Sequence, residues 1–217
     1  RDRQRTLEQL LAKEPQVDIV VSDDGLQHHR LWRDVEIAVV DERGAGNGRL
    51  LPAGPLREPL PRHADVRALV LYSAGVASLD LAGHVAHRRL AGVQPLLDWM
   101  QGAPLPPDGG WERLAGRPVF AAAGIAVPER FFMALRKQGL ELTACCPMPD
   151  HANFAHAPWP LDAADAVVTE KDAVKLNEPR FTGGPTRIWV ARLDLDLPLA
   201  FKAALDTRLR TLAPRAA

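Results

Sequence analysis

The sequence contains no Gly-Lys pair, so it lacks the glycine-rich loop ending in Gly-Lys-Ser/Thr that usually cradles nucleotide phosphates. The nearest candidate, at residues 44–48, has neither the lysine nor the G-x-G-x-x-G spacing. We interpret this segment mainly as a flexible loop and rank phosphate binding far below that. We therefore do not expect a P-loop within these 217 residues.

Other absences narrow the class of protein. Lysine and arginine balance aspartate and glutamate at 27 each, which argues against a nucleic-acid binder. No apolar run approaches the ~18 residues that a membrane-spanning helix needs. The two cysteines, Cys145 and Cys146, are adjacent in an expected strand, where neighbours point to opposite faces. A disulfide between them would be strained, and a reduced, cytosolic setting fits best.

What the sequence does contain is an alternation of strand and helix patterns, which predicts an α/β fold. Apolar residues make up 47% of the chain, enough for a proper core. Pro128 suits a first helical position and Gly139 a helix carboxyl end. Strands are expected at residues 17–22, 35–41, 66–73, 118–123, 140–146, 166–169 and 187–193, and helices at residues 6–13, 128–138 and 198–212.

The stretch between Trp99 and Gly116 is too rich in proline and glycine for regular structure and is the best domain boundary. We therefore predict a parallel-sheet domain over residues 1–112 and a smaller α/β domain over residues 113–217. The chain starts at Arg1 rather than Met, with helix-forming sequence at once and no secretory or transit segment. We interpret it as a fragment whose natural amino-terminal portion is missing.

The strongest signal of a site lies in residues 17–29. An apolar, β-branched run is typical of a buried parallel strand, and it ends in Asp23, Asp24 and Gly25. Ligands bind at the carboxyl ends of strands in open α/β sheets, and two adjacent carboxylates favour a neutralising cation. Oxygen ligation suits Mg²⁺, which shares its other sites with water and phosphates. A polar turn in which Asp24 caps the next helix is an equal alternative.

A long loop at residues 46–59 follows the next expected strand, and its three glycines and three prolines fix its path. Arg57 and Glu58 near its end offer a phosphate-binding fork and a metal-seeking carboxylate side by side. The alternative is a surface loop with an incidental ion pair.

Three further segments lie at strand ends or helix starts. Residues 123–132 form a glycine turn before a helix, where an anion could bind, although the two phenylalanines there more simply anchor the helix in the core. His151, which follows Asp150, can serve in proton transfer, but a lone histidine is more often structural. Residues 168–176 run from a strand end into charged residues, and they form either a site edge or a salt-bridged helix start.

Taken together, these segments resemble the tetraacyldisaccharide 4'-kinases, the lipid A 4'-kinases of Gram-negative bacteria. The resemblance extends from the first residues to about Leu176, in the family's order, and its first two segments are long and specific. The departures are small: His29 stands where an aromatic residue is usual, and Ala126 where glycine is common. The matching segments are residues 22–28, 46–48, 51–59, 123–125, 128–132, 150–151 and 169–172.

The resemblance implies ATP-dependent phosphorylation of the 4'-hydroxyl of a tetraacylated glucosamine disaccharide 1-phosphate, a lipid A precursor. The reaction takes place at the cytoplasmic face of the inner membrane. The implied fold is a P-loop-type parallel-sheet domain, incomplete here at its amino-terminus, followed by a smaller α/β domain. The P-loop, an aspartate base and a membrane-inserting helix would lie upstream of Arg1, so the inner membrane surface is contacted through that portion.

Carried over residue by residue, the resemblance assigns Asp23 and Asp24 to a Walker B-like Mg²⁺ site that Gln27 supports. Arg57 would face the transferring phosphoryl group, and Glu58 would assist the metal. His151 would form a dyad with the upstream aspartate. Since phosphoryl transfer needs charge neutralisation and alignment more than covalent help, carboxylate-held Mg²⁺ plus an arginine is a sufficient signature. Without the phosphate loop, we expect this chain alone to be inactive.

Two other functions stay open from the residues alone. One is an Mg²⁺-dependent phosphohydrolase that uses the acidic pair without any P-loop. The other is a non-catalytic domain that binds an acyl chain or a partner through an exposed apolar surface. A Gly-Lys-Ser/Thr loop upstream of Arg1 would favour the kinase over both.

Overall fold

The computed structural model describes residues 3–60, 68–150, 152, 154 and 156–212. The chain divides into two compact units, the first comprising Arg1–His87 with Asp196–Ala217 and the second Arg88–Leu195. This division differs from the boundary predicted at residue 112. The proline- and glycine-rich stretch lies inside the second unit because it bonds back onto a strand there: the Val93 N–H donates to the Gly109 carbonyl over 2.7 Å.

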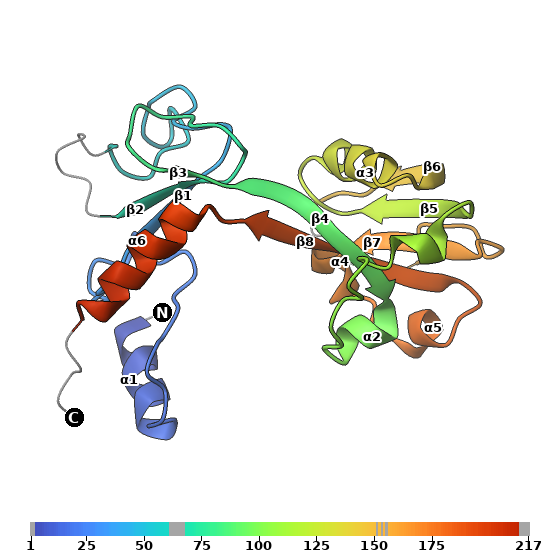
Figure 1. Ribbon diagram of the computed structural model, residues 1–217, viewed down its shortest axis with the longest axis horizontal. Helices are drawn as coiled ribbons and strands as arrows, with labels where there is room; N and C mark the ends of the chain where they lie inside the picture. The colour runs from blue at the N-terminus through green and yellow to red at the C-terminus, as the bar shows by residue number, and fades with distance from the viewer. Residues whose placement is uncertain (1–2, 61–67, 151, 153, 155, 213–217) are drawn as a thin grey trace. The chain divides into compact units, whose positions relative to one another are not determined.

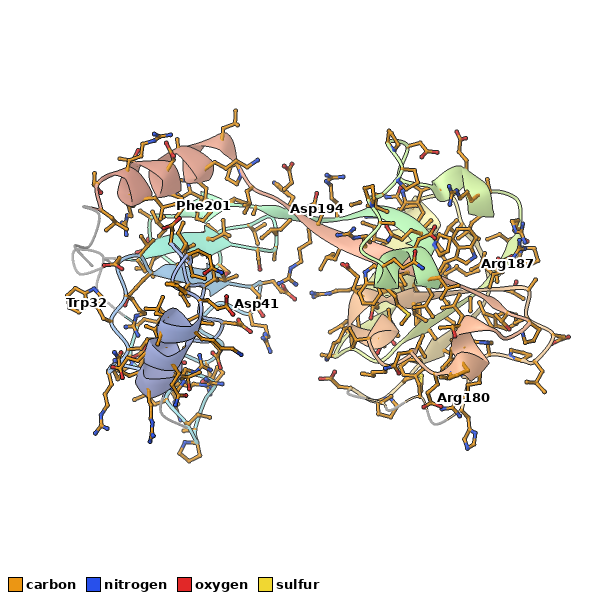
Figure 2. All side chains as sticks on the ribbon, turned by 90° about the horizontal axis from the view of Figure 1, so that it is seen from below. Trp32, Asp41, Arg180, Arg187, Asp194 and Phe201 are labelled. Carbon is orange, nitrogen blue, oxygen red and sulfur yellow. The ribbon has the colours of Figure 1, made fainter. Side chains whose placement is uncertain are left out.

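The first unit is a small parallel sheet with helices. Its strands run in the order β1 (Ile37–Val40), β2 (Leu69–Tyr72) and β3 (His84–Val85), and both pairings are parallel. The central strand β2 is buried along its whole length. Helix α6 (Leu199–Arg210) covers this sheet through Phe201, which is buried and meets the His84 ring edge-on at 5.5 Å (Figures 1 and 2). The unit begins with α1 (Arg3–Lys13).

The second unit contains a five-stranded sheet with short helices around it (Figure 1). The strand order is β4-β8-β7-β5-β6, and the pairings among β8, β7, β5 and β6 are parallel. The strands are β4 (His87–Pro95), β5 (Pro118–Ala123), β6 (Glu141–Pro147), β7 (Asp165–Thr169) and β8 (Arg187–Asp196). The helices are α2 (Leu96–Met100), η2 (Trp111–Leu114), α3 (Pro128–Lys137), α4 (Glu170–Ala173) and α5 (Pro179–Thr182).

The core of the second unit has two layers because strand neighbours alternate between the faces of the sheet. Val119 and Ala121 of β5 pack into one apolar cluster, whereas Ala122 packs into the other. The same alternation separates the two cysteines of β6: Cys145 packs against the first cluster and Cys146 against the second. Burial raises the pKa of the Cys146 thiol.

Helix α3 forms where its sequence signals predict. Pro128 occupies the first turn, and Gly139 follows the last turn with φ of +83°, a conformation that glycine adopts without strain. Phe131 and Phe132 are both buried in the core. The structure therefore confirms that these phenylalanines anchor the helix.

Most predicted strands and helices are confirmed with shifted ends, but the strand expected at residues 17–22 is wrong. These residues form no strand and are largely exposed. A parallel strand exists only when a neighbour satisfies its backbone groups, and no described strand lies beside this segment. The sequence patterns also missed β3, β4, α2, η2 and α5. Helix α4 begins within residues 168–176, where a salt-bridged helix start was one of the two expected alternatives. No described helix is long and apolar enough to cross a membrane.

The exposed segment at residues 19–21 leads to the first prediction. Ile19, Val20 and Val21 are 64%, 42% and 89% exposed, an apolar run of the kind that binds hydrophobic dyes. We expect the purified 217-residue chain to enhance the fluorescence of such a dye, and Val21→Lys to reduce that enhancement. Leu199→Lys, at a separate exposed leucine (83%), is the matched control. Dye binding that Val21→Lys leaves unchanged contradicts the prediction.

Candidate functional site

The first part of the candidate site is a tight acidic turn in the first unit. Asp24 has φ of +50°, a left-handed conformation that aspartate tolerates better than most residues. The turn is closed by a hydrogen bond of 3.0 Å from the His28 N–H to the Gly25 carbonyl. Arg33, which follows the turn in sequence, stabilises it: its guanidinium donates to the carbonyls of Gly25 and His28 over 3.0 and 3.1 Å. The turn thus presents the Asp24 carboxylate to solvent.

The second part is the loop at residues 46–59, which is folded around one side chain. The Asn47 amide donates to the Ala53 carbonyl over 2.8 Å and accepts from the Arg49 N–H over 3.1 Å. Gly54 packs so closely against this amide that an added Cβ would lie 2.1 Å from Asn47 Oδ1. Glycine is therefore required there by close approach, and the loop has a defined course up to Arg57.

Arg57 joins the loop to the turn. Its Nη1 atom lies 3.3 and 3.5 Å from the two carboxylate oxygens of Asp24 and donates to Gln27 Oε1 over 3.2 Å. Three residues that sequence reasoning singled out are thereby brought together, although Arg57 is 33 residues away from Asp24. The Arg57 and Asp24 side chains are 57% and 65% exposed, so both are accessible to a ligand.

The remaining predicted residues are placed differently. The Asp23 backbone carbonyl accepts a hydrogen bond of 2.6 Å from Arg3, and its side chain is exposed, as is that of Glu58. Within the part of the chain that the structure describes, no three His, Cys, Asp or Glu side chains form a group that could hold a metal ion. His151 lies outside the described residues.

The oxygen atoms that the turn exposes are of the type that binds hard cations. The carboxylate oxygens of Asp24 and the amide oxygen of Gln27 all face the Nη1 atom of the positively charged Arg57 side chain. Such oxygens are the ligands that Mg²⁺ takes, and Mg²⁺ usually keeps several waters beside one or two carboxylates. A partial protein shell of this kind is compatible with the ion. Metal binding at Asp23, Asp24 and Glu58 stays a prediction.

Sequence reasoning missed the residues that shape the site. Asn47 was noted only as part of a loop, and the structure shows it as the centre of that loop. Arg33 and Arg3, which hold the acidic turn from other elements, were not singled out. An Asn between two glycines is a recognisable turn signal. No comparable signal distinguishes Arg3 or Arg33 from the other arginines of the chain.

The family model for tetraacyldisaccharide-1-P 4'-kinase (LpxK) matches residues 1–210. The tetraacyldisaccharide 4'-kinase of Methylibium petroleiphilum is 51% identical over 219 residues, which cover 99% of this chain and 60% of that protein. The corresponding kinase of Leptothrix cholodnii is 51% identical over 220 residues, covering 99% and 62%. The chain therefore spans about three-fifths of the length of these curated relatives.

A solved structure agrees with the fold. The structure of LpxK from Aquifex aeolicus, described as an "apo" form in complex with ATP, matches with a TM-score of 0.74 and 23% sequence identity. The match covers 96% of this chain and 62% of that one, and at this identity it establishes the α/β fold alone. The sequence matches favour a kinase over the phosphohydrolase and non-catalytic alternatives. The chain belongs to the tetraacyldisaccharide-1-P 4'-kinase (LpxK) family.

Proposed function

We propose that the longer protein containing this chain transfers the γ-phosphoryl group of ATP to the 4'-hydroxyl of a tetraacylated glucosamine disaccharide 1-phosphate, a step of lipid A biosynthesis. The observation that carries the proposal is the convergence of Asp24, Gln27 and Arg57, from two segments, in a member of this family. ATP and the lipid A precursor are the substrates. The protein acts at the cytoplasmic face of the inner membrane, which it contacts through polypeptide outside this chain.

Arg57 supplies positive charge in the proposed mechanism. Negative charge accumulates on the oxygens of the phosphoryl group during transfer, and a guanidinium stabilises it by donating two hydrogen bonds at once. Arg57 holds a carboxylate and an amide oxygen through weak, exposed contacts of 3.2–3.5 Å. Such contacts are readily exchanged for phosphoryl oxygens, so Arg57 can turn to the substrate at little cost.

Asp23, Asp24 and Glu58 are the proposed metal ligands, and Gln27 supports them through its amide oxygen. Mg²⁺ bound there supplies charge neutralisation for the β- and γ-phosphates. The Asp24 carboxylate is 65% exposed and lies next to Arg57. These side chains can therefore bring a cation and a phosphoryl group to the same place.

His151 completes the proposed set as the partner of an aspartate base that lies outside this chain. A histidine beside a carboxylate can take the proton of the attacking 4'-hydroxyl, or raise the basicity of the carboxylate that does. Either role requires the histidine to be held in one position.

The proposal predicts a separation between turnover and stability in the full-length protein. Arg57→Ala and Asp24→Asn should each lower kcat by about a hundredfold or more, since they remove charge aimed at the transferred group. The free energy of unfolding should change by less than about 1 kcal/mol, because the pair is exposed. Steady-state kinetics and chemical denaturation measure the two quantities.

The matched control is Arg210→Ala, which removes another exposed ion pair, with Asp206 on α6. It should alter neither turnover nor stability appreciably. Unchanged turnover after Arg57→Ala would remove the phosphoryl contact from the mechanism. Asn is chosen at position 24 because it also tolerates the left-handed backbone.

A further prediction concerns the 217-residue chain by itself. Since it contains no glycine-rich phosphate loop, we expect it to bind ATP poorly and to show no kinase activity above its Asp24→Asn variant. Phosphate transfer from radiolabelled ATP to the lipid acceptor measures this directly. Activity in the isolated chain that Asp24→Asn abolishes contradicts the prediction.

A further inference from the structure

The loop at residues 46–59 presents two leucines to solvent. Leu50 and Leu51 are 43% and 62% exposed. Single exposed leucines are common on protein surfaces and need no explanation by themselves. These two differ from a scattered pair because they are adjacent, because a closely bonded backbone carries them, and because the same loop ends at Arg57.

Backbone hydrogen bonds hold both leucines in place. The Leu51 N–H donates to the Leu56 carbonyl over 2.8 Å, and the Leu56 N–H donates to the Arg49 carbonyl over 3.2 Å. The Gly54 N–H closes the tip of the loop by donating to the Leu50 carbonyl over 3.0 Å. A Cβ on Gly54 would lie only 2.3 Å from the Arg49 carbonyl oxygen, so the two sides of the loop are in direct contact. The backbone therefore cannot turn the leucines inward without breaking these bonds.

The same bonds place the leucines beside the candidate site. Leu50 and Leu56 form a parallel bridge, so the residues that follow them, Leu51 and Arg57, are next to each other in the same register. Backbones paired in this way lie about 4.8 Å apart. Leu51 is thus an exposed apolar neighbour of the arginine that contacts the acidic turn.

Positive charge lies on both sides of the two leucines. Arg49 precedes them and is exposed, and its side chain has no hydrogen bond or ion pair with the residues that the structure describes. Arg57 lies on the other side and is 57% exposed. The one acidic residue of the loop sequence, Glu58, comes after Arg57. Leucines between arginines suit a molecule that is apolar in one part and anionic in another, and the acceptor lipid of the proposed function has both acyl chains and a phosphate.

We propose that Leu50 and Leu51 are specificity-determining residues that contact an acyl chain of the acceptor lipid. The role rests on the proposed function, in which Arg57 of the same loop faces the phosphoryl group transferred to that acceptor. Covering apolar surface with an acyl chain is favourable in proportion to the area removed from water. The contact also orients the acceptor, because the leucines and Arg57 share one bonded backbone. The competing occupant is polypeptide of the longer protein, which would cover the leucines whether or not lipid is bound.

Leu51→Asn in the full-length protein tests the contact, because position 51 is exposed and the substitution should not unfold the protein. We expect the KM for the tetraacylated acceptor to rise by about 10-fold, with the KM for ATP and the kcat at saturating acceptor unchanged. With the deacylated disaccharide 1-phosphate as acceptor, the variant and the wild type should behave alike, since no acyl chain is left to contact. Leu51→Met keeps the apolar surface and should restore most of the affinity for the lipid.

Leu161→Asn, at an 87% exposed leucine of the second unit, is the matched control and should change neither KM. Equilibrium binding of the two acceptors is a second readout that needs no turnover, and Leu51→Asn should weaken binding of the acylated acceptor alone.

Unchanged KM and unchanged binding of the tetraacylated acceptor in Leu51→Asn overturn the proposal. An equal loss with both acceptors, or a lowered free energy of unfolding, also overturns it, because polypeptide then covers the leucines. Failure of the proposed function is a separate result: the wild-type full-length protein then transfers no phosphate to either acceptor, whatever the binding measurements show.

Discussion

The second unit depends on two buried carboxylates at opposite ends of one central strand. Asp165, at the start of β7, is bonded by Arg117, Arg187 and the Trp189 indole N–H, and these partners tie the entrance of β5 to β8. Asp172, just past the end of β7, is bonded by Gly124, Thr169 and Lys175. Either charge would be strongly destabilising without its partners. Together they fix β7 between its neighbours, and only the second faces the sheet edge where parallel folds bind ligands.

The candidate site of the first unit differs in that its charged side chains are exposed and not buried. The contacts of Arg57 with Asp24 and Gln27 are exposed, long and weak, whereas the shape of each supporting segment is set by backbone-directed bonds from Asn47 and Arg33. Exposed ion pairs add little stability, so they can be exchanged for a ligand without weakening the fold. Amide and guanidinium bonds to carbonyls hold the backbone, whereas the charged ends of Asp24 and Arg57 meet in a solvent-exposed contact.

How much of this could be predicted from the sequence depends on whether the signal is local. Helix α3 was predictable because a proline, a glycine and two core phenylalanines mark it within twelve residues. Strand β5 was predictable because its apolar residues are continuous and β-sheet partners lie on both sides. Residues 17–22 also carry a largely apolar run, yet they form no strand, because strand formation needs a partner that no described segment provides. An apolar pattern therefore predicts a tendency to form a strand, and pairing with a neighbouring strand determines whether one forms.

The same distinction separates the site residues. Asp24, Gln27 and Arg57 were identified one by one from short motifs, but their meeting follows from the folding of two loops. Arg33, which holds one of these loops, has no sequence mark that distinguishes it from other arginines. Asp172 is an example of a residue whose local role was predictable and whose long-range contact was not. Its Thr-x-x-Asp spacing reads as a helix cap, and it is one. The bond to Gly124, 48 residues away, exists only in the folded sheet. Local chemistry thus predicts which groups are available, whereas the pairing of distant segments determines what each of them holds.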